Sequence, residues 1–241
     1  MQEKIDYFKI SHDHKHVCNN ITFFYQTNES DRKYIDDLLT RAYDLSQKVN
    51  THAASNSLQT RHQIIVKANA IAGLLAEDLW AYCINKENAS QLVYIPTAND
   101  LSNQIDIASL NGSYTFEVRS SFPRNGIAFA VTNANYGFKI VGPYSNTYKK
   151  SENFRDFYLT VLFPLQRPGD ILTAIKTDGF TFSLSGGATL DMMIGDNSIS
   201  FIDSLRPEDA FTEETTEYQV IKIKDGLDYC EILDKIKSTL R

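Results

Sequence analysis

Residues 104–121 read QIDIASLNGSYTFEVRSS, and this stretch predicts a β-hairpin. Apolar and polar residues alternate on both sides of Asn111-Gly112, a dipeptide typical of tight hairpin turns. Asp106 lies in the first predicted strand and Glu117 in the second. Each alternates with apolar neighbours, so strand pairing brings both carboxylates to one side of the hairpin.

The two carboxylates indicate a cation site. Carboxylates among hydrophobic strand residues are costly unless they are paired or hold a cation. Mg²⁺ usually binds one or two protein carboxylates and keeps several waters. Arg119 lies two residues after Glu117 and therefore points to the same face, where its charge suits a phosphate.

This arrangement resembles the signature of the PD-(D/E)xK nuclease superfamily, the fold of most type II restriction endonucleases and many repair nucleases. The matching residues are Asp106 and, after a ten-residue gap, Glu117-Val118-Arg119 followed by Ser120-Ser121. A helix with an acidic residue commonly precedes the signature in that family. Here KANAIAGLLAEDLWAYCIN, residues 67–85, has that place. The resemblance covers residues 62–165, and the family's usual lysine is arginine in this chain.

The resemblance implies a metal site and its ligands. Asp106, Glu117 and the backbone carbonyl of Val118 would bind Mg²⁺, with Mn²⁺ as an alternative. The helix offers Glu77 and Asp78, neither of which has a basic partner within one turn. Glu77 is the predicted ligand of a second ion, directly or through water, because superfamily helices usually present a glutamate.

The order of predicted elements favours an α/β fold, with a mixed central β-sheet flanked by helices in a restriction endonuclease-like core. Residues 1–60 are expected to form an N-terminal appendage, and residues 61–241 a nuclease-like α/β domain with a C-terminal addition. The predicted helices span residues 30 or 31 to 49, 63–85 and 229–240. Besides the hairpin, strands are predicted at residues 19–25, 92–95, 138–141 (stopped by Gly142-Pro143), 156–163 (a central strand), 180–184, 198–202 and 218–223.

Charge is segregated along the chain although the net charge is −6. Residues 208–217 hold five acids and no base, whereas residues 119–167 hold seven bases and only two acids, Glu152 and Asp156. A nucleic-acid surface needs a local basic patch and not a basic total. The alternative is a solvated face with chance clustering. The predicted phosphate contacts are Arg124, Lys149, Lys150 and Arg155.

Other patterns narrow the class of protein. No apolar run approaches the roughly 18 residues of a membrane span. Three widely spaced cysteines argue against a disulfide framework and for a reducing cytoplasm. No nucleotide-binding or common hydrolase motif is present, so no nucleotide cofactor is expected. His12, His14, His16 and Cys18 would face one way in an extended chain, but a polar strand edge or a mobile terminus is favoured over a zinc site.

The sequence therefore predicts a cytoplasmic, Mg²⁺-dependent DNA endonuclease of restriction or other defence type, with a homodimer as one possible state. Asp106, Glu117 and Arg119 are the predicted catalytic residues. The alternative is a catalytically inactive nuclease-like fold that binds nucleic acid or protein. An active site requires Glu77, Asp106 and Glu117 to converge on one cation, whereas a decayed site would show a carboxylate turned away or paired with Arg119. A nuclease acting on RNA or single strands also stays open.

Overall fold

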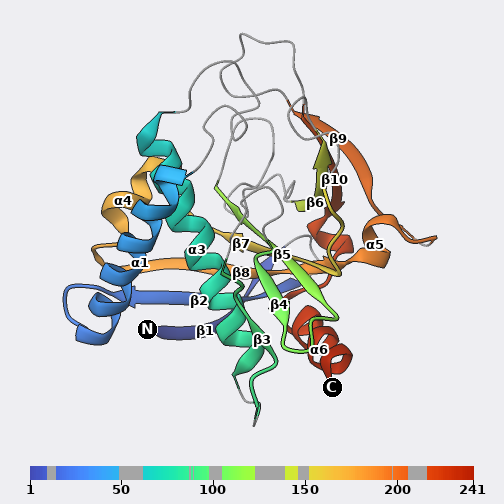
Figure 1. Cartoon of the computed structure of the whole chain (residues 1–241), viewed down its shortest axis with the longest axis horizontal. Coiled ribbons are helices and arrows are strands. Elements are labelled where there is room, and N and C mark those ends of the chain that lie inside the picture. Colours follow the sequence, from blue (N-terminus) through green and yellow to red (C-terminus); the bar gives the residue numbers. More distant parts are fainter. Residues whose placement is uncertain are drawn as a thin grey trace.

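The computed structural model describes residues 1–9, 15–48, 62–86, 88, 90–97, 105–122, 139–145, 152–196, 198–205 and 216–241. Its described strands form two sheets (Figure 1), one in the order β1-β2-β8-β7-β5-β4-β3 and one in the order β6-β10-β9. The strands are β1 (Gln2–Lys9), β2 (Lys15–Phe24), β3 (Val93–Tyr94), β4 (Ile107–Ser109), β5 (Thr115–Ser121), β6 (Lys139–Ser145), β7 (Phe157–Leu162), β8 (Asp178–Thr189), β9 (Phe201–Leu205) and β10 (Thr216–Lys222). The helices are α1 (Glu29–Lys48), α3 (Gln63–Asn85), α4 (Ile171–Ala174), α5 (Leu190–Ile194) and α6 (Tyr229–Leu240).

Strand β7 is the centre of the larger sheet, as predicted for residues 156–163. It pairs in parallel with β5 and antiparallel with β8, so the sheet is mixed. All six residues of β7 are buried, because both faces of the sheet are covered. The predicted α/β class, a mixed sheet flanked by helices, is confirmed.

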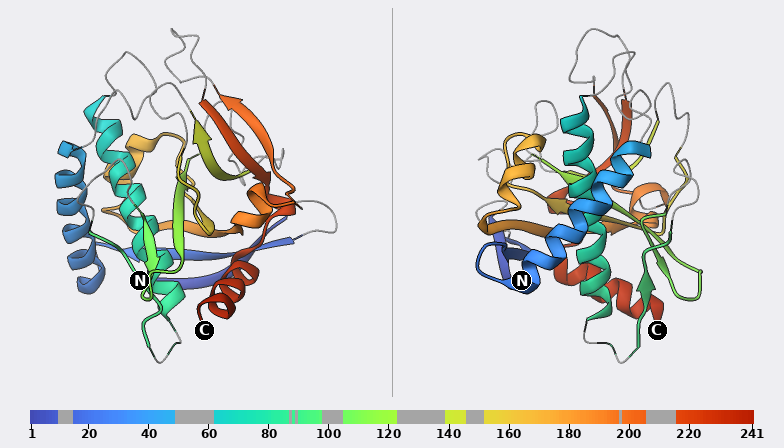
Figure 2. Two further views of the ribbon diagram at one scale, coloured as in Figure 1. Left: turned by 45° about the vertical axis from the view of Figure 1, so that its right-hand side comes forward. Right: turned by 60° about the vertical axis from the view of Figure 1, so that its left-hand side comes forward.

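Two hydrophobic cores lie against the larger sheet. Helices α1, α3, α4 and α6 share one core with β2, β5, β7 and β8. The other core joins β7 and β8 to the three-stranded sheet and α5, through residues such as Tyr158, Ile140, Ile221 and Met193. The left view of Figure 2 shows α1 and α3 on one side of the larger sheet and β6, β9 and β10 on the other.

Alternate side chains of strand β5 point to the two opposite faces of the larger sheet, and so toward the two cores. Phe116 and Val118 belong to the helical core, and the Phe116 ring stacks on Phe157 at a centroid distance of 5.0 Å. Successive side chains of a strand point to opposite faces. Glu117 and Arg119 therefore point to the face on which the three-stranded sheet lies. The fold thus carries the two charged residues of the signature into a partly enclosed position.

The long helix α3 has the predicted bounds, and so does α6. Helix α3 is apolar almost all round, which is typical of a helix buried in a core. Trp80 of α3 is fully buried and its ring lies 5.7 Å from that of Tyr229 in α6. None of the described helices is both long and apolar enough to span a membrane.

Some boundaries differ from the predictions. Strand β1 was not predicted, because its residues are largely polar. It pairs with β2 at the edge of the larger sheet, so both strands share that sheet with the hairpin. Helix α1 begins at Glu29, one or two residues earlier than predicted. Asn28 Oδ1 accepts the Asp31 N–H at 3.1 Å, whereas the Asp31 carboxylate accepts the Phe24 N–H at 2.8 Å.

Glycine and proline positions explain two further differences. Strand β6 continues through Gly142-Pro143, where a strand end was predicted, because the β6–β10 ladder has an irregularity between Tyr218 and Val220 and β6 is an edge strand. Strand β8 is one long strand and not a short one. Its Gly186 has φ 97°, and a Cβ there would lie 2.2 Å from the Leu227 carbonyl oxygen, so only glycine fits.

Candidate functional site

The predicted hairpin is confirmed and brings Asp106 to Glu117. Strands β4 and β5 are antiparallel, with Ile107 opposite Phe116. Asp106 lies immediately before β4, and extending this register by one residue places it opposite Glu117. The connecting residues 110–114 form a longer turn than the dipeptide alone predicts. Asn111 Oδ1 closes this turn by accepting hydrogen bonds from the Ser109 hydroxyl (2.7 Å) and the Ser113 N–H (3.1 Å).

Asp106 has an unusual protonation equilibrium for a carboxyl group. Burial raises its pKa to about 7, and the negative charge of Glu117 is the next cause. Its Oδ2 accepts the backbone N–H of Val118 at 2.7 Å, which acts in the opposite direction together with Arg119 and Arg155. Asp106 therefore changes charge close to neutral pH when no cation is bound.

Glu77 of α3 lies near enough to the same carboxyl groups for their charges to act on it. Its side chain is buried, and burial raises its pKa well above the ordinary range. The charges of Asp106, Asp78 and Glu117 raise that pKa further. The structure thus brings the predicted residue Glu77 into electrostatic contact with Asp106 and Glu117.

The neighbouring Asp78 has a different surrounding. Its carboxylate accepts hydrogen bonds from Arg41 Nη2 (2.6 Å), Arg41 Nη1 (3.2 Å) and the Tyr34 hydroxyl (2.8 Å), all from α1. Arg41 lies on a different helix from Asp78, so helical spacing within α3 does not reveal this partner. Asp78 therefore joins two helices and is held away from the carboxyl groups at the hairpin.

Arg119 is held between two carboxylates and an aromatic ring. Its Nη1 lies 3.1 Å from Glu117 Oε1, and its Nη2 lies 2.5 Å from Glu152 Oε2. Its Cζ lies 5.2 Å from the centre of the Tyr144 ring. The charges of Glu117 and Glu152 keep the pKa of the guanidinium above its ordinary value. Arg119 is therefore a permanent cation and cannot be a general base.

Glu152 is the site residue that the sequence interpretation missed. It is buried, and besides Arg119 it accepts the backbone N–H of Tyr144 in β6 at 3.3 Å. It links the larger sheet to the smaller one at the candidate site. The sequence did contain a sign of its role, because Glu152 is one of only two acids in the basic segment 119–167.

The predicted phosphate contacts are only partly within the described residues. Arg124, Lys149 and Lys150 lie outside them. Arg155 lies not on the surface but in the interior, where its Nε is 3.7 Å from Glu117 Oε2. Lys139, from the same basic segment, forms an ion pair with Asp203 at 2.5 Å. In the described part, several bases of this segment thus neutralise acids of the protein.

The histidine run contributes no metal centre among the described residues. His12 and His14 lie outside them, while His16 is buried with its Nε2 2.7 Å from the Ser185 carbonyl oxygen. Burial raises the pKa of the Cys18 thiol to about 12, so it stays neutral. His16 and Cys18 belong to β2, and β1 pairs with β2 on its outer side. Strand β2 is therefore not the edge strand of the sheet.

Glu77, Asp106 and Glu117 influence one another electrostatically but do not converge on one cation position. Within the described ranges, no group of three or more histidine, cysteine, aspartate or glutamate side chains is arranged to hold a metal ion. Helix α3 packs on the Phe116 and Val118 face of β5, whereas Glu117 points to the other face. Glu77 and Glu117 thus approach Asp106 from different sides. Comparison of the chain with known family models, with curated proteins and with solved structures gave no match.

Proposed function

We propose that this chain is a metal-dependent nuclease that hydrolyses phosphodiester bonds in DNA, with a restriction or other defence role. The observation that carries the proposal is the electrostatic effect on one another of three carboxyl groups, the buried Glu77 and Glu117 and the half-buried Asp106. Burial is the largest cause of the raised pKa of both Glu77 and Asp106. The charges of Asp106, Asp78 and Glu117 raise the pKa of Glu77 further, and that of Glu117 helps to raise the pKa of Asp106 to about 7. Strongly raised carboxyl pKa values are typical of functional sites.

The donor set of this cluster fits a hard divalent cation. Carboxylate and carbonyl oxygens are the ligands that Mg²⁺ and Mn²⁺ prefer. Asp106, Glu117 and the Val118 carbonyl would hold the ion, and Glu77 would reach a second ion directly or through water. When bound, the metal lowers the pKa of the attacking water and stabilises charge on the scissile phosphate. Cation binding would also remove the repulsion among the three carboxylates.

Arg119 is the residue that would meet the phosphate. Its charge is fixed, and its planar guanidinium can bind two phosphate oxygens at once. It now binds Glu117 and Glu152, so phosphate oxygens would have to replace the Glu152 carboxylate. The substrate therefore competes with Glu152 for the guanidinium.

A second candidate is a nuclease-like fold that binds nucleic acid or protein without cleaving it. The observation that favours it is the ion pair between Glu117 and Arg119 at 3.1 Å, which occupies a proposed metal ligand. The sequence predicts such a pair for a decayed site, and the described carboxyl groups also do not converge on one cation position, as an active site requires. The two candidates differ in whether a cation can displace Arg119 from Glu117.

Cleavage of supercoiled plasmid tests the two candidates. The purified protein is incubated with Mg²⁺, with Mn²⁺ or with EDTA, beside Asp106→Asn, Glu117→Gln and the exposed-site control Glu29→Gln. A nuclease converts the plasmid only with metal, and only the first two variants lose this activity. If the plasmid stays intact in the presence of metal but the protein retards DNA in a gel, the binding module is supported. A protein that neither cleaves nor binds DNA would reject the nuclease and the DNA-binding form of the second candidate.

Thermal unfolding gives an independent readout of the metal site. A cation that binds only the folded chain stabilises it by about 2.7 kcal/mol at 100 times its dissociation constant. Mg²⁺ should therefore raise the melting temperature of the parent and of Glu29→Gln. Asp106→Asn should respond much less. An equal response of parent and Asp106→Asn would place cation binding elsewhere.

A further inference from the structure

Aromatic rings and cations alternate along one face of the three-stranded sheet, starting at Arg119. Arg119 Cζ lies 5.2 Å from the centre of the Tyr144 ring, which lies 5.6 Å from the Tyr218 ring. Farther along, Nζ of Lys139 and of Lys222 lie 5.6 and 5.9 Å from the centre of the Phe201 ring. We call this row the aromatic stripe; its residues are Tyr144, Tyr218, Phe201, Lys139 and Lys222.

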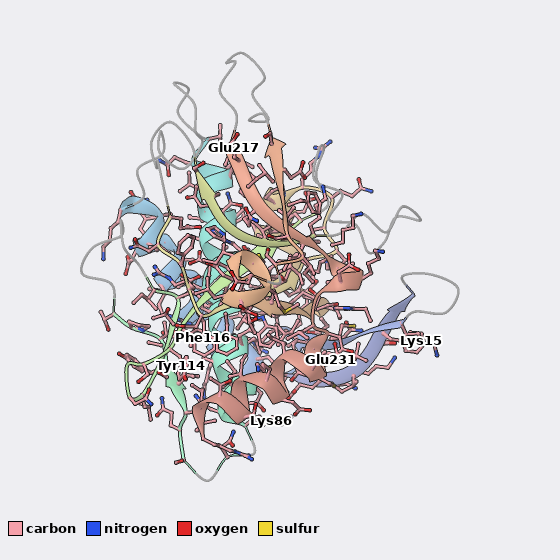
Figure 3. All side chains as sticks on the ribbon, turned by 90° about the vertical axis from the view of Figure 1, so that its right-hand side faces the viewer. Lys15, Lys86, Tyr114, Phe116, Glu217 and Glu231 are labelled. Atoms are coloured by element: carbon pink, nitrogen blue, oxygen red, sulfur yellow. The ribbon has the colours of Figure 1, made fainter. Side chains whose placement is uncertain are left out.

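The strand register places the stripe on a single face. Tyr218 pairs with Tyr144 on one side and with Asp203 on the other. Lys222 pairs with Lys139, and Phe201 lies two residues from Asp203 on β9. Paired residues of a sheet and alternate residues of a strand share a face. Figure 3 looks toward the side of the molecule with this sheet and labels Glu217 of β10 near its upper end.

The stripe is open to solvent at the end away from Arg119. Phe201 is 37% exposed, which is unusual for a phenylalanine in a sheet, and Lys222 is exposed. The two tyrosines are half-buried. Val220 lies on the same face, opposite Phe201 and between Tyr218 and Lys222 on β10, and its almost complete burial anchors the strand at this point. Large rings are thus presented on a firmly packed sheet.

The charge balance indicates which form of nucleic acid suits the stripe. The cations Arg119, Lys139 and Lys222 are offset by two acids, since Glu152 pairs with Arg119 and Asp203 with Lys139. Duplex binding depends mainly on neutralising many phosphates and leaves the bases stacked on each other. Unpaired strands stack their bases on aromatic side chains, and each stacked base contributes about 5- to 150-fold in affinity. Binding sites for unpaired strands also need basic residues along the path of the backbone, and the exposed Lys222 supplies one beside the Phe201 ring. The rings of the stripe, more than its charge, match this second mode.

We propose that the aromatic stripe binds an unpaired nucleic-acid strand and leads it to Arg119. Bases would stack on Phe201 and the tyrosines, while Lys222 and Lys139 would contact the phosphates between them. This inference rests on the proposed function only in taking nucleic acid as the ligand. It concerns the unpaired part of that ligand, a single strand or an unpaired end of a duplex. The shared chemistry of single-stranded DNA and RNA is what the stripe recognises.

Binding measured in EDTA tests the stripe without requiring cleavage. Fluorescence anisotropy compares a short labelled oligothymidylate, an oligouridylate and a duplex of equal length. Phe201→Ala should weaken single-strand binding about 5- to 150-fold, and Phe201→Trp should bind like the parent. The matched control is Ile202→Ala, which removes a 57% exposed side chain from the opposite face of the same strand. Its affinity should equal that of the parent.

A second pair of variants tests the phosphate contact. Lys222→Ala should reduce the slope of log affinity against log salt by about 0.7 for a single strand. Lys224→Ala, which removes an exposed lysine two residues further on, should leave the slope unchanged. The inference is overturned if Phe201→Ala and Ile202→Ala behave alike, if the duplex binds more tightly than the single strands, or if no strand binds. If the protein cleaves plasmid but Phe201→Ala leaves single-strand affinity unchanged, the stripe is rejected and the nuclease proposal stands. If single-strand affinity depends on Phe201 but no plasmid is cleaved, the stripe stands and the nuclease proposal is rejected.

Discussion

Arg119 Nη2 lies 2.5 Å from Glu152 Oε2, at the point where the larger sheet meets the smaller one. The same guanidinium reaches Glu117 at 3.1 Å, so one cation serves two buried carboxylates. Breaking a buried ion pair by removing one partner leaves an unbalanced charge, which is strongly destabilising. Arg119 therefore stabilises the folded chain as well as offering a charge to a phosphate.

Replacing Glu152 should release Arg119 for its substrate. In Glu152→Gln we expect nucleic-acid affinity in EDTA to rise about fivefold, the equivalent of about 1 kcal/mol, since a competing charge is removed. The free energy of unfolding should fall by about 1–3 kcal/mol, because buried polar partners lose a charged acceptor. Anisotropy and urea unfolding measure the two effects, with Glu29→Gln as control. Unchanged affinity would mean that Arg119 does not meet phosphate.

The requirement at position 119 is a positive charge. Arg119→Lys should keep measurable cleavage, because lysine preserves the charge and is the usual residue of the resembling family. Arg119→Ala should lose cleavage while still binding DNA. The exposed Arg167 provides a matched control, and Arg167→Ala should cleave like the parent. Full activity of Arg119→Ala in a plasmid assay would remove this residue from the mechanism.

Stability of the metal-free chain should fall as pH rises toward neutrality. The pKa of Asp106 is raised from an ordinary value of 3.8 to about 7, so the folded state binds the proton more tightly than the unfolded state. Its stabilising contribution is present below about pH 4 and is lost as pH rises to about 7. Asp106→Asn keeps an acceptor for the Val118 N–H and should flatten this pH dependence.

The size of the Asp106 effect is bounded by the pKa change. At about 1.4 kcal/mol for each pKa unit, Asp106→Asn can gain up to about 4 kcal/mol above neutral pH. Urea unfolding in EDTA across the pH range measures this gain, and the exposed Asp225→Asn is the control. Glu117→Gln should instead lose stability, because Glu117 balances Arg119 and Arg155. A loss of stability in Asp106→Asn at neutral pH would show that the carboxylate is structural.

Glu77 and Asp78 should separate activity from stability. Glu77→Gln should abolish metal-dependent cleavage and hold or raise the melting temperature in EDTA, since the raised pKa of Glu77 makes its charged form unfavourable. Asp78→Asn should retain cleavage but lose about 1–3 kcal/mol, because Arg41 and Tyr34 lose a charged acceptor. Each variant is the control of the other. The opposite pattern would assign the metal to Asp78.

Local patterns in the sequence determined several elements of this protein. The 3.6-residue periodicity gave the bounds of α3 and α6, because a buried helix face repeats along neighbouring turns. The run at residues 156–163 and the hairpin around Asn111-Gly112 were predictable for the same reason, since strand alternation and turn chemistry are local. The positions of Asp106 and Glu117 opposite each other followed directly from that hairpin.

Only the tertiary structure decided the partners of the charged residues. Arg41 reaches Asp78 from another helix, Glu152 reaches Arg119 from 33 residues away, and Arg155 is buried beside Glu117 where a surface contact was predicted. The register that gathers Phe201, Lys139 and Lys222 joins three strands from distant parts of the chain. No local periodicity encodes such contacts, because they depend on how two sheets and their helices pack. The sequence by itself determined which residues could carry chemistry, and the three-dimensional arrangement decided which charges face one another.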